Sequence, residues 1–241
     1  MTTREATPLL ARGNTAPSRL ADSLVTVLAA PIQSPWLLRS LWGGTKVEKA
    51  RLLNRLGLPA DALPNLGSWK ADTGLLHLLV DMIEAGQPQQ VVELGAGAST
   101  LVIARALALN GGGRLHSHDQ HADFVAATRA WLAEHELAAD LRVAPLGDPP
   151  RGWPGLWYQL DALPAEIDLL VVDGPHWTLH PMVRGAAETL FERIAPGGSV
   201  ILDDAARPGE RLVAFRWKRD WPDFDWSFRP GIKGTLIGTR R

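Results

Sequence analysis

The sequence contains no cysteine, which excludes disulfide bonds and cysteine-ligated zinc. This absence favours a reducing, cytoplasmic location. The 241 residues carry a formal net charge of −1, so no basic surface points to nucleic acid as an obligate partner. We therefore expect no nucleic-acid partner.

Long hydrophobic runs are missing as well. The longest apolar stretch near the N-terminus, residues 24–32, is far shorter than the roughly 20 residues that a transmembrane helix needs. Residues 1–14 include Arg4, Glu5 and Arg12 and lead into no long apolar segment, which is not the pattern of a secretory signal. We expect no stable insertion into a membrane.

One segment that is present carries most of the information. Residues 91–100 read Val-Val-Glu-Leu-Gly-Ala-Gly-Ala-Ser-Thr and lead into a second apolar run. This order predicts a buried strand, a tight turn and a helix, the unit that cradles a nucleotide-like ligand. A dinucleotide site would have a third glycine where Thr100 stands, and Glu93 would bring a carboxylate near the pyrophosphate. Glu93 suits a cationic or amino-bearing ligand instead.

The chain from residue 90 onward alternates between strand and helix patterns. Strands are expected at 91–94, 114–118, 141–145, 167–172 and 199–203, and helices at 98–109, 121–137, 178–194 and 208–220. Residues 153–163 read as a short helical or irregular piece, and residues 224–238 as a hairpin. Such alternation implies a parallel sheet covered on both faces. The sequence therefore predicts an α/β, doubly wound, mostly parallel fold.

The first 69 residues follow a different pattern. Residues 1–16 lack periodicity and are expected to be disordered. Residues 18–42 are expected to form one or two short helices that break at Pro31 and Pro35. We predict an N-terminal tail with a helical extension over residues 1–69, and the α/β domain over residues 70–241.

Two helix starts are marked in and near this extension. Thr45 and Glu48 form a capping box that opens a helix running to Gly57. Asp72 or Thr73 is expected to cap the helix that precedes the first strand.

The segment Glu93-Leu94-Gly95-Ala96-Gly97 resembles motif I of the class I S-adenosylmethionine-dependent methyltransferases. Segments 115–119, 167–176 and 197–205 are similar to that family in the same order. Together with residues 155–158, they resemble the small-molecule branch that includes macrolide-sugar O-methyltransferases. The resemblance covers roughly residues 70–240 and implies a seven-stranded, Rossmann-like sheet with the N-terminal helices lying over the active-site face.

The resemblance also implies S-adenosylmethionine as cofactor. Its methionine end would lie at Glu93, Gly95 and Gly97, and its ribose at Asp119. Asp119 can also cap the helix that starts near His121, and the two roles can coexist. The full set of expected cofactor-binding residues is Glu93, Gly95, Ala96, Gly97, Ser99, Asp119, Gln120, Asp148 and Asp173.

Three acids follow the fourth and fifth expected strands. In some relatives acids at positions matching Asp173, Asp203 and Asp204 bind Mg²⁺, a hard cation that prefers oxygen ligands. Mg²⁺ is therefore a candidate second cofactor. The alternative is that Asp173 holds its loop while Asp203 or Asp204 caps a turn.

A base for methyl transfer is expected after Asp173. Sugar-modifying relatives often have a second acid just after the Asp-Gly pair, but Pro175 stands there in this chain. His176 is therefore the candidate base beside Asp173, because neutral imidazole is available at physiological pH. The alternative for His176 is packing against Trp177.

The function that the resemblance implies is methyl transfer from S-adenosylmethionine to a small-molecule acceptor, with oxygen as the expected methylated atom. Homo-oligomerisation is left open. Two alternatives keep the fold: a non-catalytic cofactor-binding or interaction module, and a peripheral membrane methyltransferase that uses residues 20–42. The histidines of residues 116–121 resemble a hydrolase zinc motif, but the acid stands one place early.

Overall fold

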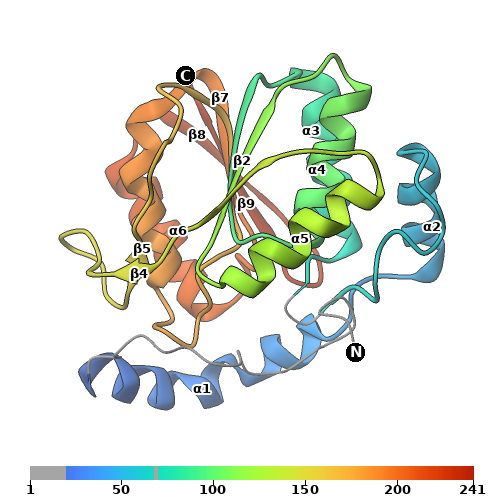
Figure 1. Cartoon of the computed structure of the whole chain (residues 1–241). Helices are drawn as coiled ribbons and strands as arrows, with labels where there is room; N and C mark the ends of the chain where they lie inside the picture. The colour runs from blue at the N-terminus through green and yellow to red at the C-terminus, as the bar shows by residue number, and fades with distance from the viewer. Residues whose placement is uncertain (1–19, 68–69) are drawn as a thin grey trace.

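The computed structural model describes residues 20–67 and 70–241, and its centre is one seven-stranded sheet (Figure 1). The strand order is β3-β2-β1-β6-β7-β9-β8, in which all neighbours are parallel except the pairs that involve β9. The strands are β1 (Gln90–Leu94), β2 (Arg114–Asp119), β3 (Asp140–Val143), β6 (Ile167–Val172), β7 (Ile194–Leu202), β8 (Phe224–Arg229) and β9 (Thr235–Arg240). The predicted doubly wound sheet with a C-terminal hairpin is confirmed.

Helices cover both faces of this sheet. On one face lie α3 (Thr73–Gly86), α4 (Ala98–Leu109) and α5 (Ala122–Glu134); on the other lie the 3₁₀ segment η1 (Val183–Arg193) and α6 (Pro208–Asp220) (Figure 1). Strand residues alternate between the two layers. In β6, Leu169 and Val171 belong to the apolar cluster of α3 and α4, whereas Leu170 and Val172 belong to the cluster of η1 and α6. Burial on both faces explains why this strand is a continuous apolar run.

The carboxyl ends of the central strands meet at one edge of the sheet. Hydrogen bonds join the residues just beyond these ends: the amide of Gly95 donates to the carbonyl of His118 over 2.8 Å, and the amide of Asp173 to that of Leu94 over 2.9 Å. Open α/β sheets bind ligands at this edge. The motifs that the sequence placed after β1, β2, β6 and β7 are therefore neighbours in space.

The N-terminal extension begins with one helix, α1 (Leu20–Ser40), so the predicted break at Pro31 and Pro35 is wrong. Pro35 has no N–H for the carbonyl of Pro31, four residues earlier. The hydroxyl of Ser34 donates to that carbonyl over 2.8 Å, which satisfies it and lets the helix continue.

Helix α1 contacts α6 and leaves apolar side chains exposed. Leu24, Val27, Leu28 and Trp42 are exposed, whereas Trp36 is half-buried, so residues 20–42 present only part of their apolar side chains to a membrane surface. Within the described ranges, no helix has both the length and the apolar character to cross a membrane. The peripheral membrane role stays a prediction.

Helix α2 (Lys46–Arg55) opens with the predicted capping box. The amide of Glu48 donates to Thr45 Oγ1 over 3.1 Å, and Glu48 Oε2 accepts from the amide of Thr45 over 2.7 Å. Asp72 caps α3, its Oδ1 accepting from the amide of Leu75 over 2.8 Å. Leu52 and Leu53 of α2 belong to the same core cluster as α3 and α4. The boundary after residue 69 stays a prediction, and residues 1–16 lie outside the described ranges.

Two expected elements on the other face differ from the structure. The helix expected at 178–194 is instead the 3₁₀ segment η1. Within this segment, a Cβ on Gly185 would lie 1.8 Å from the ring of Trp153. Residues 153–163 contain a short strand, β5 (Trp157–Tyr158), which pairs with β4 (Leu146–Gly147). The close approach of the Trp153 ring requires glycine at residue 185.

Candidate active site

The turn after β1 lies against the loop after β6. Gly95 has a φ of +103°, a conformation that favours glycine, and a Cβ there would lie 2.9 Å from the amide nitrogen of Gly174. Around Gly97, by contrast, a Cβ would meet no atom within 4 Å. The turn is therefore packed tightly toward Asp173-Gly174 and leaves space at Gly97 for a ligand.

Glu93 lies beneath this turn, fully buried. The amide of Gly97 donates to Thr100 Oγ1 over 2.8 Å, and Thr100 Oγ1 donates to Glu93 Oε2 over 2.6 Å. Ser117 Oγ donates to the same carboxylate oxygen over 2.6 Å. Thr100, at the position where dinucleotide sites have glycine, thus connects Glu93 to the turn.

The buried position of Glu93 predicts a specific pH dependence. Burial raises the pKa of Glu93 from 4.5 to about 7. The folded state binds the Glu93 proton more tightly than the unfolded chain does, so protonation of Glu93 stabilises the fold. This stabilisation is present below pH 4.5 and is lost as the pH rises to about 7. The loss is about 3 kcal/mol. Glu93→Gln keeps an acceptor for Thr100 and Ser117 without titrating.

The measurement is urea unfolding of wild type and Glu93→Gln across the range from acid to mildly alkaline pH. The wild type should lose about 3 kcal/mol of unfolding free energy relative to the variant over that range. Glu166→Gln removes a carboxylate at an exposed position and serves as the matched control. Parallel stability curves for wild type and Glu93→Gln would show that Glu93 is ionised throughout.

Asp119 ties the end of β2 to the glycine turn. Its Oδ2 accepts from the amide of Ala96 over 3.2 Å, and its Oδ1 accepts from the amide of His121 over 2.8 Å. Burial raises the pKa of Asp119 to about 6. The N-cap residue of α5 is His121 itself, so Asp119 supports the helix start without being its cap. Both oxygens have further lone pairs for a ligand hydroxyl.

Two further predicted cofactor residues, Gln120 and Asp148, lie in different places: Gln120 follows β2, and Asp148 follows β4. Gln120 is half-buried, and its Oε1 has no hydrogen-bond partner among the described residues. Glu93 Oε1 is likewise buried without a partner in that part of the chain. Asp148 is exposed and follows β4 in the separate two-stranded sheet. Unsatisfied buried oxygens beside an open turn fit a ligand that carries amino and hydroxyl groups.

A pocket adjoins the turn. Its walls are the start of α4, one side of α5 and the loop before α3, and its lining includes Gly97, Lys70, Phe124 and Trp131. The indole N–H of Trp131 donates to the carbonyl of Ala62 over 3.1 Å, which fixes this wall to the N-terminal extension. The glycine turn at Gly97 was the wall predicted from the sequence, whereas the walls from α5 and the loop before α3 come from distant segments and have no local signal.

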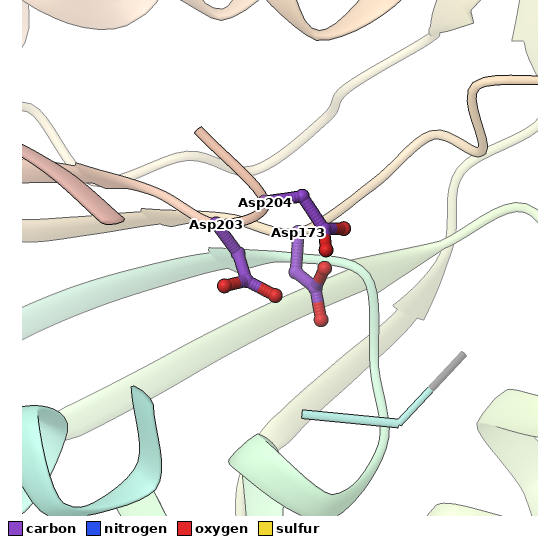
Figure 2. Close-up of side chains that lie close together, drawn as sticks. All are labelled: Asp173, Asp203 and Asp204. Atoms are coloured by element: carbon purple, nitrogen blue, oxygen red, sulfur yellow. The ribbon is translucent and has the colours of Figure 1, made fainter. Parts of the chain in front are cut away.

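Three carboxylates converge at the ends of β6 and β7 (Figure 2). Asp173, Asp203 and Asp204 each offer an oxygen, and these oxygens lie within 4.8 Å of one another. No other group of three potential metal ligands occurs in the described ranges. The predicted cluster exists, whereas His116, His118 and His121 do not gather as a zinc site.

Buried cations already face these carboxylates. Arg184 contacts Asp173 Oδ1 and Asp204 Oδ2, both over 3.1 Å. Arg207 contacts Asp204 Oδ2 over 3.0 Å, and Lys233 Nζ lies 3.7 Å from an oxygen of Asp203 and of Asp204. A basic residue at the start of a helix, as Arg207 is, ordinarily lies on a solvated face, but Arg207 is buried between Asp204 and Glu210.

Because these cations already pair with Asp173, Asp203 and Asp204, the three carboxylates do not fit a divalent metal ion. The cations beside Asp204 hold the pKa of that carboxyl well below its usual range, although burial opposes them. A metal ion at this site would lie among the positive charges of Arg184, Arg207 and Lys233, which already pair with the three carboxylates. Mg²⁺ is not needed to neutralise this cluster.

His176 lies in the loop after Asp173. Its Nδ1 accepts from the amide of Thr178 over 3.2 Å and lies 2.8 Å from Thr178 Oγ1. Burial, together with Arg207 and Arg184, lowers the pKa of His176 well below its usual 6.5. The ring also lies 5.6 Å from that of Trp177, centroid to centroid, so the packing that the sequence offered as an alternative is present. A neutral ring that accepts at Nδ1 carries its proton on Nε2.

Comparisons with known proteins agree with this arrangement. Residues 92–205 match a family model described as a methyltransferase domain. A methyltransferase from Geobacter sulfurreducens has 22% identity and a TM-score of 0.53, over 80% of this chain and 86% of that one. The O-methyltransferase TomG from Streptomyces achromogenes has 18% identity and a TM-score of 0.51, over 86% and 98%. No curated protein matches the chain.

A further similar structure is the O-methyltransferase from Bacillus cereus, solved with S-adenosylhomocysteine. It has 14% identity and a TM-score of 0.54, over 92% of this chain and 99% of that one. At these identities the structures establish the fold, and the family model spans Gly95, Asp119, Asp173 and Asp203. Residues 92–205 therefore match a methyltransferase domain, and the chain has the Rossmann-like fold of the class I S-adenosylmethionine-dependent methyltransferases.

Proposed function

We propose that this protein methylates a hydroxyl group of a small molecule. The observation that carries the proposal is the direct contact between two loops. The glycine turn that suits the cofactor packs against Asp173-Gly174, so a cofactor at Gly97 and Asp119 would lie beside the carboxylates at the ends of β6 and β7. A donor site and an acceptor site that share one edge of the sheet suit group transfer.

Residues of the turn are proposed to hold the cofactor. Asp119 would accept hydrogen bonds from ribose hydroxyls while keeping its bonds to Ala96 and His121. Glu93 fixes the turn through Thr100, and its buried charge favours a cationic ligand nearby. S-adenosylmethionine supplies an electrophilic methyl group on a sulfonium centre. The proposed contact set is the predicted one: Glu93, Gly95, Ala96, Gly97, Ser99, Asp119, Gln120, Asp148 and Asp173.

Asp173 and His176 are proposed to act on the acceptor. Of the two carboxylate oxygens of Asp173, Arg184 contacts Oδ1, and 13% of the Asp173 side chain remains exposed. Oδ2 is therefore the oxygen proposed to face an acceptor. Asp173 can then take the hydroxyl proton as the new carbon–oxygen bond forms. His176, protonated at Nε2, orients the acceptor by donation, because Thr178 occupies its Nδ1.

The acceptor class rests on similarity. The S. achromogenes and B. cereus structures are named as O-methyltransferases, and the first is described as involved in tomaymycin synthesis. The motifs of this chain resemble the macrolide-sugar branch. We propose sugar and phenolic hydroxyls as the first acceptors to screen, and a cytoplasmic location, which the absence of cysteine supports.

Calorimetric titration with S-adenosylmethionine, and separately with NAD, tests the proposal. We expect binding of the sulfonium ligand alone, weakened about 10- to 100-fold in Asp119→Ala, because hydrogen bonds to a charged acceptor are lost. Asp123→Ala, an exposed acid in the first turn of α5, is the control. Absence of S-adenosylmethionine binding in folded protein would refute the proposed function. Binding without transfer to any acceptor would favour the non-catalytic module.

A further inference from the structure

The carboxylate cluster contains a cation that belongs to the chain. Lys233 lies in the turn between β8 and β9, and its side chain is buried. Its Nζ lies 3.7 Å from Asp203 Oδ2 and 3.7 Å from Asp204 Oδ1. The ammonium group thus faces two of the three carboxylates whose spacing otherwise suits a metal ion.

The position of Lys233 is fixed by its surroundings. Its Nζ donates to the carbonyl of Lys70 over 3.0 Å, and its own carbonyl accepts from the amide of Ala206 over 3.0 Å. The carbonyl of Gly234 accepts from the amide of Ala205 over 2.9 Å. These two hydrogen bonds tie the turn to Ala205 and Ala206, the residues that follow Asp203-Asp204. They therefore fix the position of the ammonium group relative to the two carboxylates.

The other two cations complete this arrangement. Arg184 pairs with Asp173 and Asp204, and Arg207 pairs with Asp204 and Glu210, while Asp203 faces Lys233. Asp203 oxygens accept no hydrogen bond from the described residues, so Lys233 is the ion-pair partner found for this carboxylate there. An unpaired buried carboxylate would be costly, and a bound cation would relieve that cost.

We propose that Lys233 is a positioning residue that supplies the charge a divalent metal would otherwise supply, so that the carboxylate cluster works without metal. This inference deepens the proposed function, because it concerns the same acceptor site. Removing the ammonium group should leave Asp203 without its ion-pair partner, whereas Asp173 and Asp204 keep Arg184 and Arg207. Such a set of oxygens would then take a hard divalent cation from solution.

The test is calorimetric titration of Mn²⁺ into wild type, Asp203→Asn, Lys233→Met and the double variant Lys233→Met with Asp203→Asn, without cofactor or acceptor. We expect no stoichiometric site in the wild type up to about 1 mM Mn²⁺, the weak end of protein sites for hard cations. Lys233→Met should gain one site that binds at least about tenfold tighter, and Asp203→Asn should abolish it. Lys218→Met, an exposed lysine of α6, is the matched control.

Two results would overturn the inference: one Mn²⁺ per wild-type chain that is lost in Asp203→Asn, or folded Lys233→Met that gains no site. Should Lys233→Met fail to fold, the wild-type titration and its Asp203→Asn control still decide the question. The readout is metal binding, so it does not depend on methyl transfer, and failure of the proposed function would appear separately as absence of S-adenosylmethionine binding. Methyl transfer that survives a chelator is the expected second result.

Discussion

Arg184→Met is expected to lower the free energy of unfolding by about 3–5 kcal/mol, the cost of breaking a buried ion pair by removing one partner. The guanidinium group contacts Asp173 and Asp204 and donates to the carbonyls of Asp173, Pro175 and Asp203. Methionine fills similar space and supplies none of these donors. Two carboxylates and three carbonyls would lose a buried donor.

Urea unfolding at neutral pH measures this effect, with the midpoint and the slope fitted together. Arg55→Met is the matched control, because Arg55 also contacts two carboxylates, those of Asp81 and Glu84, at 2.8 and 2.6 Å, but on the surface. Surface pairs contribute about 0–1 kcal/mol, so this variant should remain near wild-type stability. Equal effects of the two substitutions would show that the Arg184 network is not buried in solution.

Features set by neighbouring residues were predictable from the sequence. The capping box of Thr45 and Glu48 needs only a spacing of three residues, and helix α4 has the predicted bounds of 98–109 because glycines precede it and Asn110 ends it. The strand β6 was predicted with its observed bounds, since a run of six residues that is buried on both faces has few other interpretations. Local chemistry and periodicity are sufficient in these cases.

Features set by distant residues were not predictable in the same way. Arg184 and Lys233 meet at the same carboxylate, Asp204, although they lie 49 positions apart in the sequence. A lone basic residue in a helical or turn pattern ordinarily indicates a solvated surface. The pair Asp203-Asp204 after a strand therefore predicted a metal site, because the cations that neutralise these carboxylates leave no local signal in the sequence. Similarly, the continuity of α1 depends on the rotamer of Ser34, which no propensity reveals.

The roles of Asp173 and His176 can be separated by their hydrogen bonds. Asp173→Asn is expected to lower kcat by about 10²–10⁴-fold, the usual contribution of a general base. The amide oxygen still accepts from Arg184, so the loop should keep its position. His176→Gln should lower kcat by less than about tenfold, because a side-chain amide can still donate to the acceptor.

Single-turnover methyl transfer, with an acceptor found in the screen of hydroxyl compounds, measures both variants. Calorimetry with S-adenosylmethionine is the control, and its affinity should change little in His176→Gln. The reverse order of effects would reassign the proton to His176. That outcome would require the ring to give up the hydrogen bond from Thr178 to Nδ1 and move its proton there, leaving Nε2 as the base. The observed acceptance at Nδ1 argues for Asp173, since a base must present a lone pair to the proton that it removes.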